Sequence, residues 1–417
     1  MRILVYSHDA YGLGNIRRML AICEHLLQEI PELSILLLSG SPMLQGFRMP
    51  KGLDYIKLPC LNRGESGEVA VKFLGMGIEQ TVKLRSELIL SAAINFQPDL
   101  FLVDKKVFGL KNELTDTINY LHKSLPESKL VLLLRDILDS PETTLAEWQK
   151  HAYYEALEKF YHQILIVGTP EVFDTAREYK FPPAIAEKVR YCGYMRRQPG
   201  LKSERCIRKE LQILPQEPLI LVTPGGGEDG YELVDAYLSA LALMPKDNNI
   251  KSLIICGPEM PAQQKQLVVK AAGNNPQIII GEFTDDLMSY MQAANLVVSM
   301  AGYNTVCEIL SADKPAIVLP RCKPSMEQLI RANNMAYLGL FKAIHPENID
   351  HKNLMNEILI QLGEKPQNHY CFNINMNGLP RVKEYISILL TQTSCERQLS
   401  KFYQNPSFIP SLVIGNR

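Results

Sequence analysis

Short apolar segments rich in β-forming residues recur along this chain, and stretches with helical spacing separate them. In the first half these segments are ILVYS (3–7), ILLLS (35–39), DYIKL (54–58), DLFLVD (99–104), LVLLLRD (130–136) and ILIVG (164–168). Between the first two, apolar residues fall at i, i+3, i+4 and i+7, which is typical of a helix with one buried face. Apolar strands that alternate with amphipathic helices predict a parallel sheet covered on both faces.

The same pattern restarts after a polar segment, YMRRQPGLKSER (194–205). The later apolar segments are PLILVT (218–223), SLIIC (252–256), QIIIG (277–281), LVVSM (296–300) and AIVLP (316–320). We therefore predict two doubly wound α/β domains, in residues 1–198 and 199–378, followed by a helix over 379–390 and an irregular tail to residue 417. Two such domains enclose a cleft at the carboxyl ends of their strands, so functional residues are expected in the loops that follow strands.

Composition narrows the classes of function. The 417 residues carry a net charge of −1, so the charge indicates no nucleic-acid partner. No apolar run approaches the roughly 20 residues of a membrane span, and the apolar start is too short for a signal peptide. Nine cysteines are scattered without a CxxC pair, as in free thiols of a reducing compartment. We expect a cytoplasmic protein.

The loop TPGGGEDG (223–230) follows a predicted strand and precedes a predicted helix. Gly225, Gly226 and Gly227 allow backbone N–H groups to approach an anion, and the helix N-terminus adds a favourable dipole. This pattern predicts a diphosphate-binding loop. A tight turn that needs positive φ is one alternative. A dinucleotide site, with Glu259 as the acid for the ribose, is another.

The segment SMAGYNTVCEILSADKPAIVLP (299–320) is the most informative stretch of the chain. A turn at Gly302 is followed by Asn304 or Thr305, either of which suits a helix N-cap. Glu308 then lies in the first turns of that helix, where one carboxylate can accept hydrogen bonds from two ribose hydroxyls. Alternatively, Glu308 only complements the helix dipole.

Downstream, KPSMEQLIRAN (323–333) places Glu327 and Gln328 near the start of another helix. There they would either hydrogen-bond to sugar hydroxyls or belong to a solvated face.

Together, AGYNTVCEILSADKPAIVLPR and EQLIRA resemble the nucleotide-sugar signature of GT-B glycosyltransferases of family 28. That family includes the enzyme that adds N-acetylglucosamine to the lipid carrier of peptidoglycan synthesis. The resemblance implies that Glu308 holds the ribose and that Glu327 with Gln328 meets the donor sugar. It also implies that residues 302–305 surround the nucleotide and its α-phosphate. Asp313 and Lys314 stand where the pattern usually has a glycine.

The whole chain also resembles a bacterial group of predicted glycosyltransferases with the GT-B fold. Further matches are YSHDAYGLGNIRR, SGSPMLQGFRMPKGLDYIKLP, VDKKVFGLKNEL, LLRDILDSPE, GTPEVF and CGYMRR. The resemblance implies a donor in the second domain, most simply a UDP-sugar with a hexose-type sugar, and an acceptor in the first domain. No further cofactor and no metal are expected, because glycine loops and helix N-termini would carry the phosphate charge.

The first loop, YGLGNIRR (11–18), combines Gly12 and Gly14 with two arginines. In the related group this loop usually reads GLGH, and its histidine is a natural base. Asn15 stands at that position here and cannot accept a proton near neutral pH, so it can only orient or hydrogen-bond. We expect Arg17 or Arg18 to bind a phosphate or carboxylate of the acceptor, unless both are solvated.

Three residues at the carboxyl ends of first-domain strands remain as candidate bases. Asp9 and Asp104 are preferred, and His8 is the third, although it is also compatible with a satisfied, half-buried histidine. Asp104 next to Lys105 is also compatible with a structural ion pair. Arg135 and the aspartate that follows it end an apolar strand. We expect this charged pair either to mark the edge of the cleft or to form an ion pair within the domain.

Two alternatives to a glycosyltransferase remain open. A non-hydrolysing sugar-nucleotide epimerase has the same two-domain fold, and a catalytically impaired GT-B binding protein would explain Asn15. A lipid-linked acceptor would also require contact with the inner face of the membrane. The segment MLQGFRMPKGL (43–53) would suit such contact, unless it is an ordinary loop packed on its domain; its relevant residues are Met43, Leu44, Phe47, Arg48, Met49 and Lys51.

Overall fold

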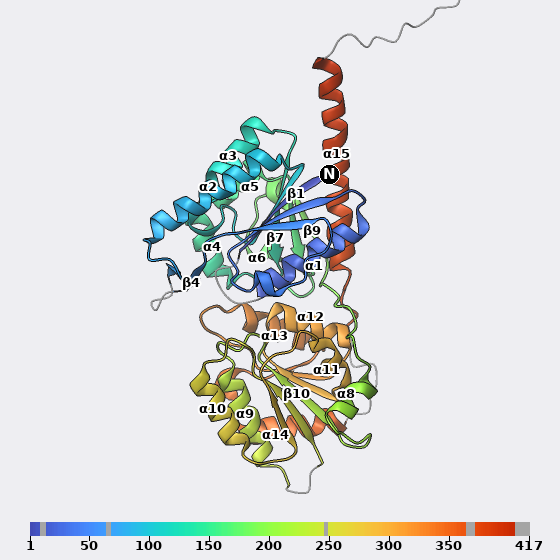
Figure 1. Cartoon of the computed structure of the whole chain (residues 1–417). Coiled ribbons are helices and arrows are strands. Elements are labelled where there is room, and N and C mark those ends of the chain that lie inside the picture. Colours follow the sequence, from blue (N-terminus) through green and yellow to red (C-terminus); the bar gives the residue numbers. More distant parts are fainter. Residues whose placement is uncertain (9–13, 64–67, 246–248, 364–371, 405–417) are drawn as a thin grey trace, which may run out of the picture.

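Two parallel sheets form the centres of the two halves of the chain (Figure 1). The computed structural model describes residues 1–8, 14–63, 68–245, 249–363 and 372–404. The first sheet has the order β3-β2-β1-β6-β7-β8-β9 and the second the order β12-β11-β10-β13-β14-β15. Every neighbouring pair in both sheets is parallel. The prediction of two doubly wound α/β units is confirmed.

All eleven strands expected from the apolar segments are present. Helices cover both faces of each sheet, so its strands are buried on both sides and their sequences are apolar. The strands of the first domain are β1 (Arg2–Ser7), β2 (Ser34–Ser39), β3 (Leu53–Lys57), β6 (Leu100–Asp104), β7 (Lys129–Arg135), β8 (Gln163–Val167) and β9 (Val189–Tyr191), with a small hairpin of β4 (Leu61–Arg63) and β5 (Val69–Val71). Its helices are α1 (Gly14–Glu29), α2 (Ile78–Phe96), α3 (Thr115–Ser124), α4 (Pro141–Lys150), α5 (Tyr153–Phe160), α6 (Thr175–Glu178) and α7 (Pro183–Ala186). The sequence pattern missed β4, β5 and β9, which have only three residues each.

The second domain repeats this plan. Its strands are β10 (Leu219–Thr223), β11 (Lys251–Ile255), β12 (Ile278–Gly281), β13 (Leu296–Ser299), β14 (Ala316–Val318) and β15 (Lys342–Ala343). Its helices are α8 (Glu204–Glu210), α9 (Tyr231–Ala242), α10 (Ala262–Ala272), α11 (Leu287–Ala293), α12 (Tyr303–Ala312), α13 (Glu327–Tyr337) and α14 (His351–Gly363). Local signals start several helices; Asp286, for example, caps α11 by accepting a hydrogen bond from the backbone N of Ser289.

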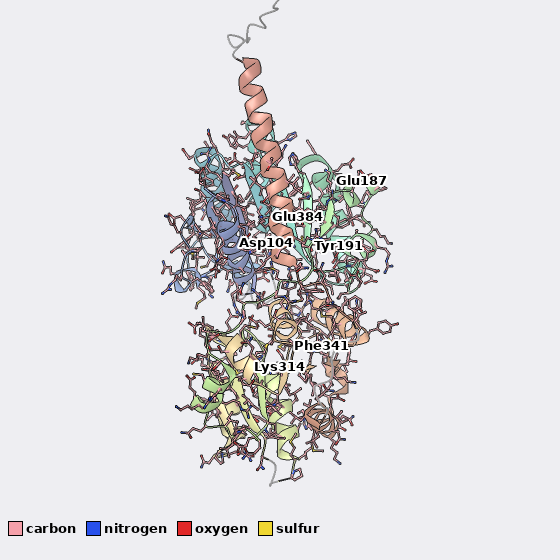
Figure 2. The ribbon with its side chains drawn as sticks, turned by 90° about the vertical axis from the view of Figure 1, so that its right-hand side faces the viewer. Asp104, Glu187, Tyr191, Lys314, Phe341 and Glu384 are labelled. Carbon is pink, nitrogen blue, oxygen red and sulfur yellow. The ribbon has the colours of Figure 1, made fainter. Side chains whose placement is uncertain are left out.

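The last helix, α15 (Gly378–Gln404), returns to the first domain and packs along α1 (Figures 1 and 2). Val382, Ile386 and Leu390 on its inner face belong to the same buried cluster as β1 and α1. The helix is therefore longer than the expected 379–390 and covers the first domain, whereas residues 405–417 lie outside the described part. The chain crosses between domains twice, once after β9 and once before α15.

Strand order reverses between β1 and β6 in the first sheet and between β10 and β13 in the second. At such a reversal the loops after the two central strands diverge and leave a crevice, which is where open α/β sheets bind ligands. The loops after β1 and β6 carry His8 and Asp104, and those after β10 and β13 carry the glycine loop and the turn at Gly302. The topology therefore brings the predicted site residues to the edges where the two domains meet.

Candidate functional site between the domains

The glycine loop after β10 and the turn after β13 lie side by side in the second domain. A Cβ atom on Gly225 would stand 3.6 Å from Thr305 Oγ1, and Ser299 Oγ donates a hydrogen bond to the carbonyl of Thr223 at 2.5 Å. Gly225 and Gly227 have φ values of +82° and +94°, so the tight-turn interpretation holds for both. A turn of this kind also exposes backbone N–H groups to an anion, and the two interpretations are compatible.

Glu259, the acid of the dinucleotide alternative, takes part in the structure of the glycine loop. Its backbone N donates to the carbonyl of Gly226 at 2.9 Å, and a Cβ on Gly226 would stand 2.7 Å from Glu259 Oε2. Burial raises the pKa of Glu259, and the negative charges of Glu228 and Asp229 raise it further. Asp229 in turn forms an ion pair with Arg321.

Glu308 is buried where α12 faces the first domain. Its residue is 2% exposed, and its Oε1 accepts from Arg17 Nη2 at 2.9 Å across the domain boundary. Its Oε2 is also buried and has no hydrogen-bond partner in the described part of the chain. A carboxylate that complements the helix dipole would lie in the first turn. Because α12 begins at Tyr303, Glu308 lies beyond that turn. The carboxylate therefore bonds across the domain boundary through one oxygen, and its other oxygen is buried without a partner among the described residues.

Gly14, the described glycine of the first-domain loop, lies against the turn after β13. Asn304 Nδ2 donates to the carbonyl of Gly14 at 2.9 Å, and a Cβ on Gly14 would stand 3.5 Å from the same nitrogen. Gly12 and Asp9 lie outside the described residues.

Arg18 and Asp104 form an ion pair of 2.6 Å inside the first domain, with both side chains 1% exposed. Figure 2 labels Asp104 within this domain. The second oxygen of Asp104 accepts from the backbone N of His8 at 3.3 Å. Asn15 donates to the His8 carbonyl and accepts from Arg18 Nη2 at 3.3 Å. Arg18 is thus buried and not solvated. Asp104 does form an ion pair, but its partner is Arg18 and not Lys105, which the sequence suggested. Asn15 orients the end of β1, as an amide can.

His8 is buried among positive charges. Burial lowers its pKa well below the usual value, and Lys105, Lys106 and Arg135 lower it further. Its Nδ1 has no hydrogen-bond partner among the described residues. Burial and Arg135 also lower the pKa of Lys105, to about 8. The first-domain edge of the cleft therefore combines a neutral imidazole with several cationic groups.

A buried ion network joins the two domains beside these residues. Arg135 Nη1 contacts Glu327 Oε1 at 2.8 Å, and Arg331 Nη2 contacts the same oxygen at 2.8 Å. Arg331 also forms a bidentate pair with Asp136, at 2.6 and 2.7 Å. Burial alone would raise the pKa of Glu327, but Arg135 and Arg331 outweigh it and hold the pKa at about 2. Gln328 is buried as well. Neither residue forms a solvated face.

Sequence reasoning missed the part played by Arg331 and underused Asp136. The available signals were a charge at a helical position for Arg331, on α13, and a charge directly after the apolar strand β7 for Asp136. Tyr303 was also missed: its ring stacks on Tyr194, with 5.9 Å between ring centroids, and the Arg18 and Arg331 guanidinium groups lie 5.9 and 5.7 Å from its centroid.

The segment 43–53 is packed mainly as an ordinary loop. Leu44 is fully buried, Phe47 and Met49 pack against the core, and Met43 remains 45% exposed. This packing agrees with the ordinary-loop interpretation and not with a membrane patch of these four apolar side chains. No helix within the described ranges is long and apolar enough to cross a membrane. In the same part of the chain, no group of three or more His, Cys, Asp or Glu residues is placed to hold a metal ion.

Comparison with known proteins identifies the type of the second domain. Residues 219–378 match the model of the glycosyltransferase family 28 C-terminal domain. A 168-residue stretch is 29% identical to the UDP-N-acetylglucosamine–N-acetylmuramyl-(pentapeptide) pyrophosphoryl-undecaprenol N-acetylglucosamine transferase of Clostridium botulinum; it covers 40% of this chain and 44% of that protein. The chain spans about half the length of the curated relatives it matches.

Solved structures resemble the whole chain. MurG of Acinetobacter baumannii superposes with a TM-score of 0.55 at 14% identity, covering 94% of this chain and 99% of that one. A Listeria monocytogenes structure described as a UDP-N-acetylglucosamine 2-epimerase gives a TM-score of 0.61 at 13% identity, covering 93% and 95%. The chain has the GT-B fold and is similar to family 28, as the sequence motifs predicted.

Proposed function

We propose that the chain is a glycosyltransferase that takes a hexose-type sugar from a UDP-sugar bound by its second domain. The observation that carries the proposal is the Glu308 carboxylate, which is buried at the domain boundary with Oε2 unpartnered among the described residues. Thr305, one turn earlier on α12, lies against Gly225 of the glycine loop. Ribose and diphosphate would thus be held by adjacent loops, and all of these residues fall within the family 28 match.

In the proposed reaction an acceptor hydroxyl oxygen attacks the anomeric carbon of the donor. The bond from that carbon to the diphosphate oxygen breaks, the nucleoside diphosphate leaves with the electron pair, and a base takes the hydroxyl proton. Both oxygens of Asp104 are engaged by Arg18 and the His8 backbone, which favours a structural role for it. We therefore propose His8 as the base, because its Nδ1 has no hydrogen-bond partner within the described residues and an imidazole nitrogen can accept a proton.

The leaving diphosphate needs positive charge or hydrogen-bond donors. The glycine loop before α9, the N-terminus of α12 and the guanidinium of Arg17 supply these in the proposal. A metal ion is then not required for departure of the diphosphate.

We further propose that the acceptor is lipid-linked and that the protein reaches it by peripheral contact with the inner face of the membrane. The precedent is the undecaprenol-linked substrate in the name of the relative. The support from this chain is a group of exposed apolar side chains in the segment that runs from the end of β5 into α2. Its exposed side chains are Phe73, Leu74, Met76, Leu84 and Leu88.

Titration calorimetry with a panel of UDP- and dTDP-sugars tests the donor site. Glu308→Ala is expected to weaken binding at least about tenfold, because a charge-assisted hydrogen bond contributes about 1.5–3 kcal/mol. Glu187→Gln, an exposed position on the first domain (Figure 2), is the control and should bind like the wild type. Undiminished affinity in Glu308→Ala would refute the donor-site assignment.

Turnover with the same panel separates the candidate activities. Transfer or slow hydrolysis of the donor supports the glycosyltransferase. Interconversion of donor epimers would support the epimerase, whose fold is shared. Binding without turnover would identify a catalytically impaired binding protein.

A further inference from the structure

Arg17 contacts the carboxylate on which the proposed donor site depends. Its Nη2 donates to Glu308 Oε1 at 2.9 Å across the domain boundary. The side chain of Arg17 is 40% exposed, whereas that of Glu308 is 2% exposed. Ribose hydroxyls can therefore reach this carboxylate only after a covering group moves, and Arg17 is an exposed group in direct contact with it.

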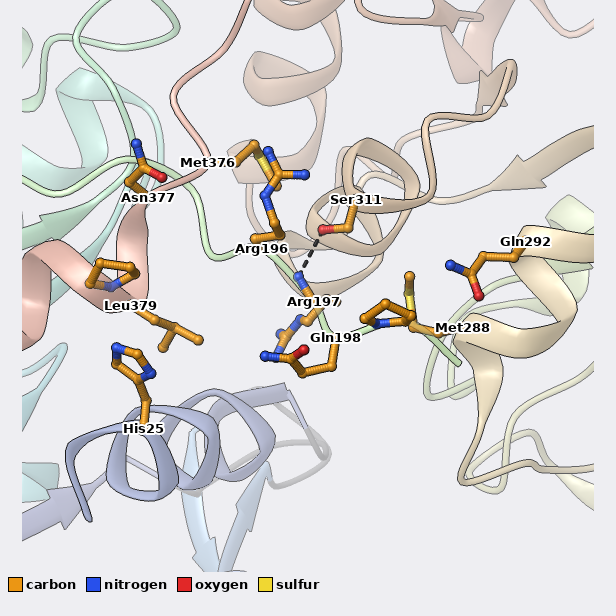
Figure 3. A pocket seen from close by; sticks show the side chains of 12 residues that line it. His25, Arg196, Arg197, Gln198, Met288, Gln292, Ser311, Met376, Asn377 and Leu379 are labelled. Carbon is orange, nitrogen blue, oxygen red and sulfur yellow. Dashed lines mark hydrogen bonds between the residues drawn. The ribbon is translucent and has the colours of Figure 1, made fainter. Parts of the chain in front are cut away.

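Helix α12, which carries Glu308, is tied at both of its ends to the linker after β9. The backbone N of Arg197, on that linker, donates to Ser311 Oγ at 2.8 Å near the end of the helix (Figure 3). Arg197 Nη2 donates to Asn304 Oδ1 at 2.7 Å near its start. The helix is thus fixed in place, so the group that moves is the side chain of Arg17.

The two neighbouring arginines of α1 differ in how firmly they are held. Arg18 is buried and forms an ion pair with Asp104 at 2.6 Å, with both side chains 1% exposed. Arg17 bonds to its carboxylate through Nη2 and is partly exposed. Because solvent screens a partly exposed pair, Arg17 can change partner at a smaller cost than Arg18.

A second partner for Arg17 would lie close by. Thr305 precedes Glu308 by three residues on α12, so their side chains lie on one face of the helix, about 5–6 Å apart. A Cβ atom on Gly225 would stand 3.6 Å from Thr305 Oγ1. The glycine loop to which we assign the diphosphate is therefore about one helical turn from the Arg17 guanidinium. A diphosphate carries more negative charge than a carboxylate and offers two acceptor oxygens to the guanidinium.

We propose that Arg17 is a switch that leaves Glu308 and contacts the diphosphate when a sugar nucleotide binds. The inference rests on the proposed function and adds the residue that controls access to its donor site. The exchange frees the Glu308 carboxylate for ribose hydroxyls and moves a positive charge to the group that later departs. A nucleoside without phosphates offers Arg17 no new partner, so the switch favours nucleoside diphosphates over nucleosides.

Titration calorimetry of the full chain with uridine and UDP tests the exchange, because uridine has the ribose but no phosphate. Arg17→Ala should bind uridine at least about threefold more tightly than the wild type, since no guanidinium competes for Glu308. Its preference for UDP over uridine should be at least about tenfold smaller, since the contact with the diphosphate is lost. Arg177→Ala removes an exposed arginine that pairs with Glu178 at 2.7 Å, and this control should leave both affinities unchanged.

Carboxyl labelling measures the cover without any nucleotide. The protein is treated with a carbodiimide and glycine ethyl ester, and the labelled residues are identified by mass spectrometry. Glu308 should be labelled several-fold faster in Arg17→Ala than in the wild type. Glu384, which is exposed on α15, is the internal reference and should be labelled equally in both proteins.

The outcomes separate the switch from the donor site itself. Unchanged or weaker uridine binding in Arg17→Ala, or unchanged labelling of Glu308, would overturn the switch while UDP binding still supports the donor site. An unchanged preference for UDP would refute the exchange onto the diphosphate. Absence of UDP binding to both proteins would instead refute the donor site, and the switch with it.

Discussion

Replacement of Arg331 by methionine tests whether the buried ion network holds the two domains together. Arg331 is fully buried and donates to Asp136 through two nitrogens, to Glu327 at 2.8 Å and to the carbonyl of Ala301 at 2.8 Å. Methionine fills similar space without charge. Among the described residues, the Asp136 carboxylate would then keep hydrogen bonds from the Tyr194 hydroxyl and from the backbone N of Ile137.

The expected loss follows from the unpaired carboxylate. Removing one partner of a buried ion pair costs about 3–5 kcal/mol, because the remaining charge stays desolvated. Arg331→Met should therefore lower the free energy of unfolding by that amount. Combining it with Asp136→Asn removes the unpaired charge and should recover part of the loss, giving a coupling of about 1–3 kcal/mol.

Urea unfolding followed by circular dichroism measures these differences. Arg381→Met is the matched control, because Arg381 pairs with Glu384 at 2.8 Å on an exposed face of α15. Exposed pairs contribute about 0–1 kcal/mol, so this variant should remain close to the wild type. If Arg331→Met also unfolds within about 1 kcal/mol of the wild type, or if its effect simply adds to that of Asp136→Asn, the network does not carry the stability we assign to it.

Three further predictions concern the site. Asn15→His should change UDP-sugar affinity less than about twofold (about 0.4 kcal/mol) by calorimetry, since the Asn15 bonds lie within the first domain; a tenfold change would contradict this. Transferase activity should survive EDTA, and a loss reversed by added metal would count against departure of the diphosphate without a metal. Because the folded-state pKa of Glu327 is about 2 and its unfolded value is about 4.3, its contribution of about 3 kcal/mol is present above pH ~4.3 and lost as pH falls toward 2. Unfolding measured across that range should show a smaller loss in Glu327→Gln, and equal slopes would refute the assignment.

Local patterns were sufficient for most of the fold. Fully buried strands such as β6 and β10 stand out because helices cover both of their faces, and burial on both faces favours a nearly continuous run of apolar residues. Strands of two or three residues carry too few side chains for a pattern. The return of α15 to the first domain depends on packing against α1, which no local signal in residues 378–390 reveals.

The site was predictable as a set of loops but not as a set of contacts. Glu308, Thr305 and Gly225 were proposed as site residues from residue type and position after strands, and the structure places Thr305 beside Gly225. The sequence alone offered Arg17 as a ligand for the acceptor, whereas in this structure it contacts Glu308.

The amino-acid sequence by itself determined two parallel α/β domains, the loops that bear the site, and the similarity of the second domain to family 28. These follow from periodicity and short motifs, which act over a few residues. Only the tertiary structure decided which charges meet, because partners such as Asp136 and Arg331 are 195 residues apart along the chain. It also decided that Asp104 pairs with Arg18 inside the first domain and that Glu308 pairs with Arg17 across the domain boundary, because both pairings depend on how distant segments pack.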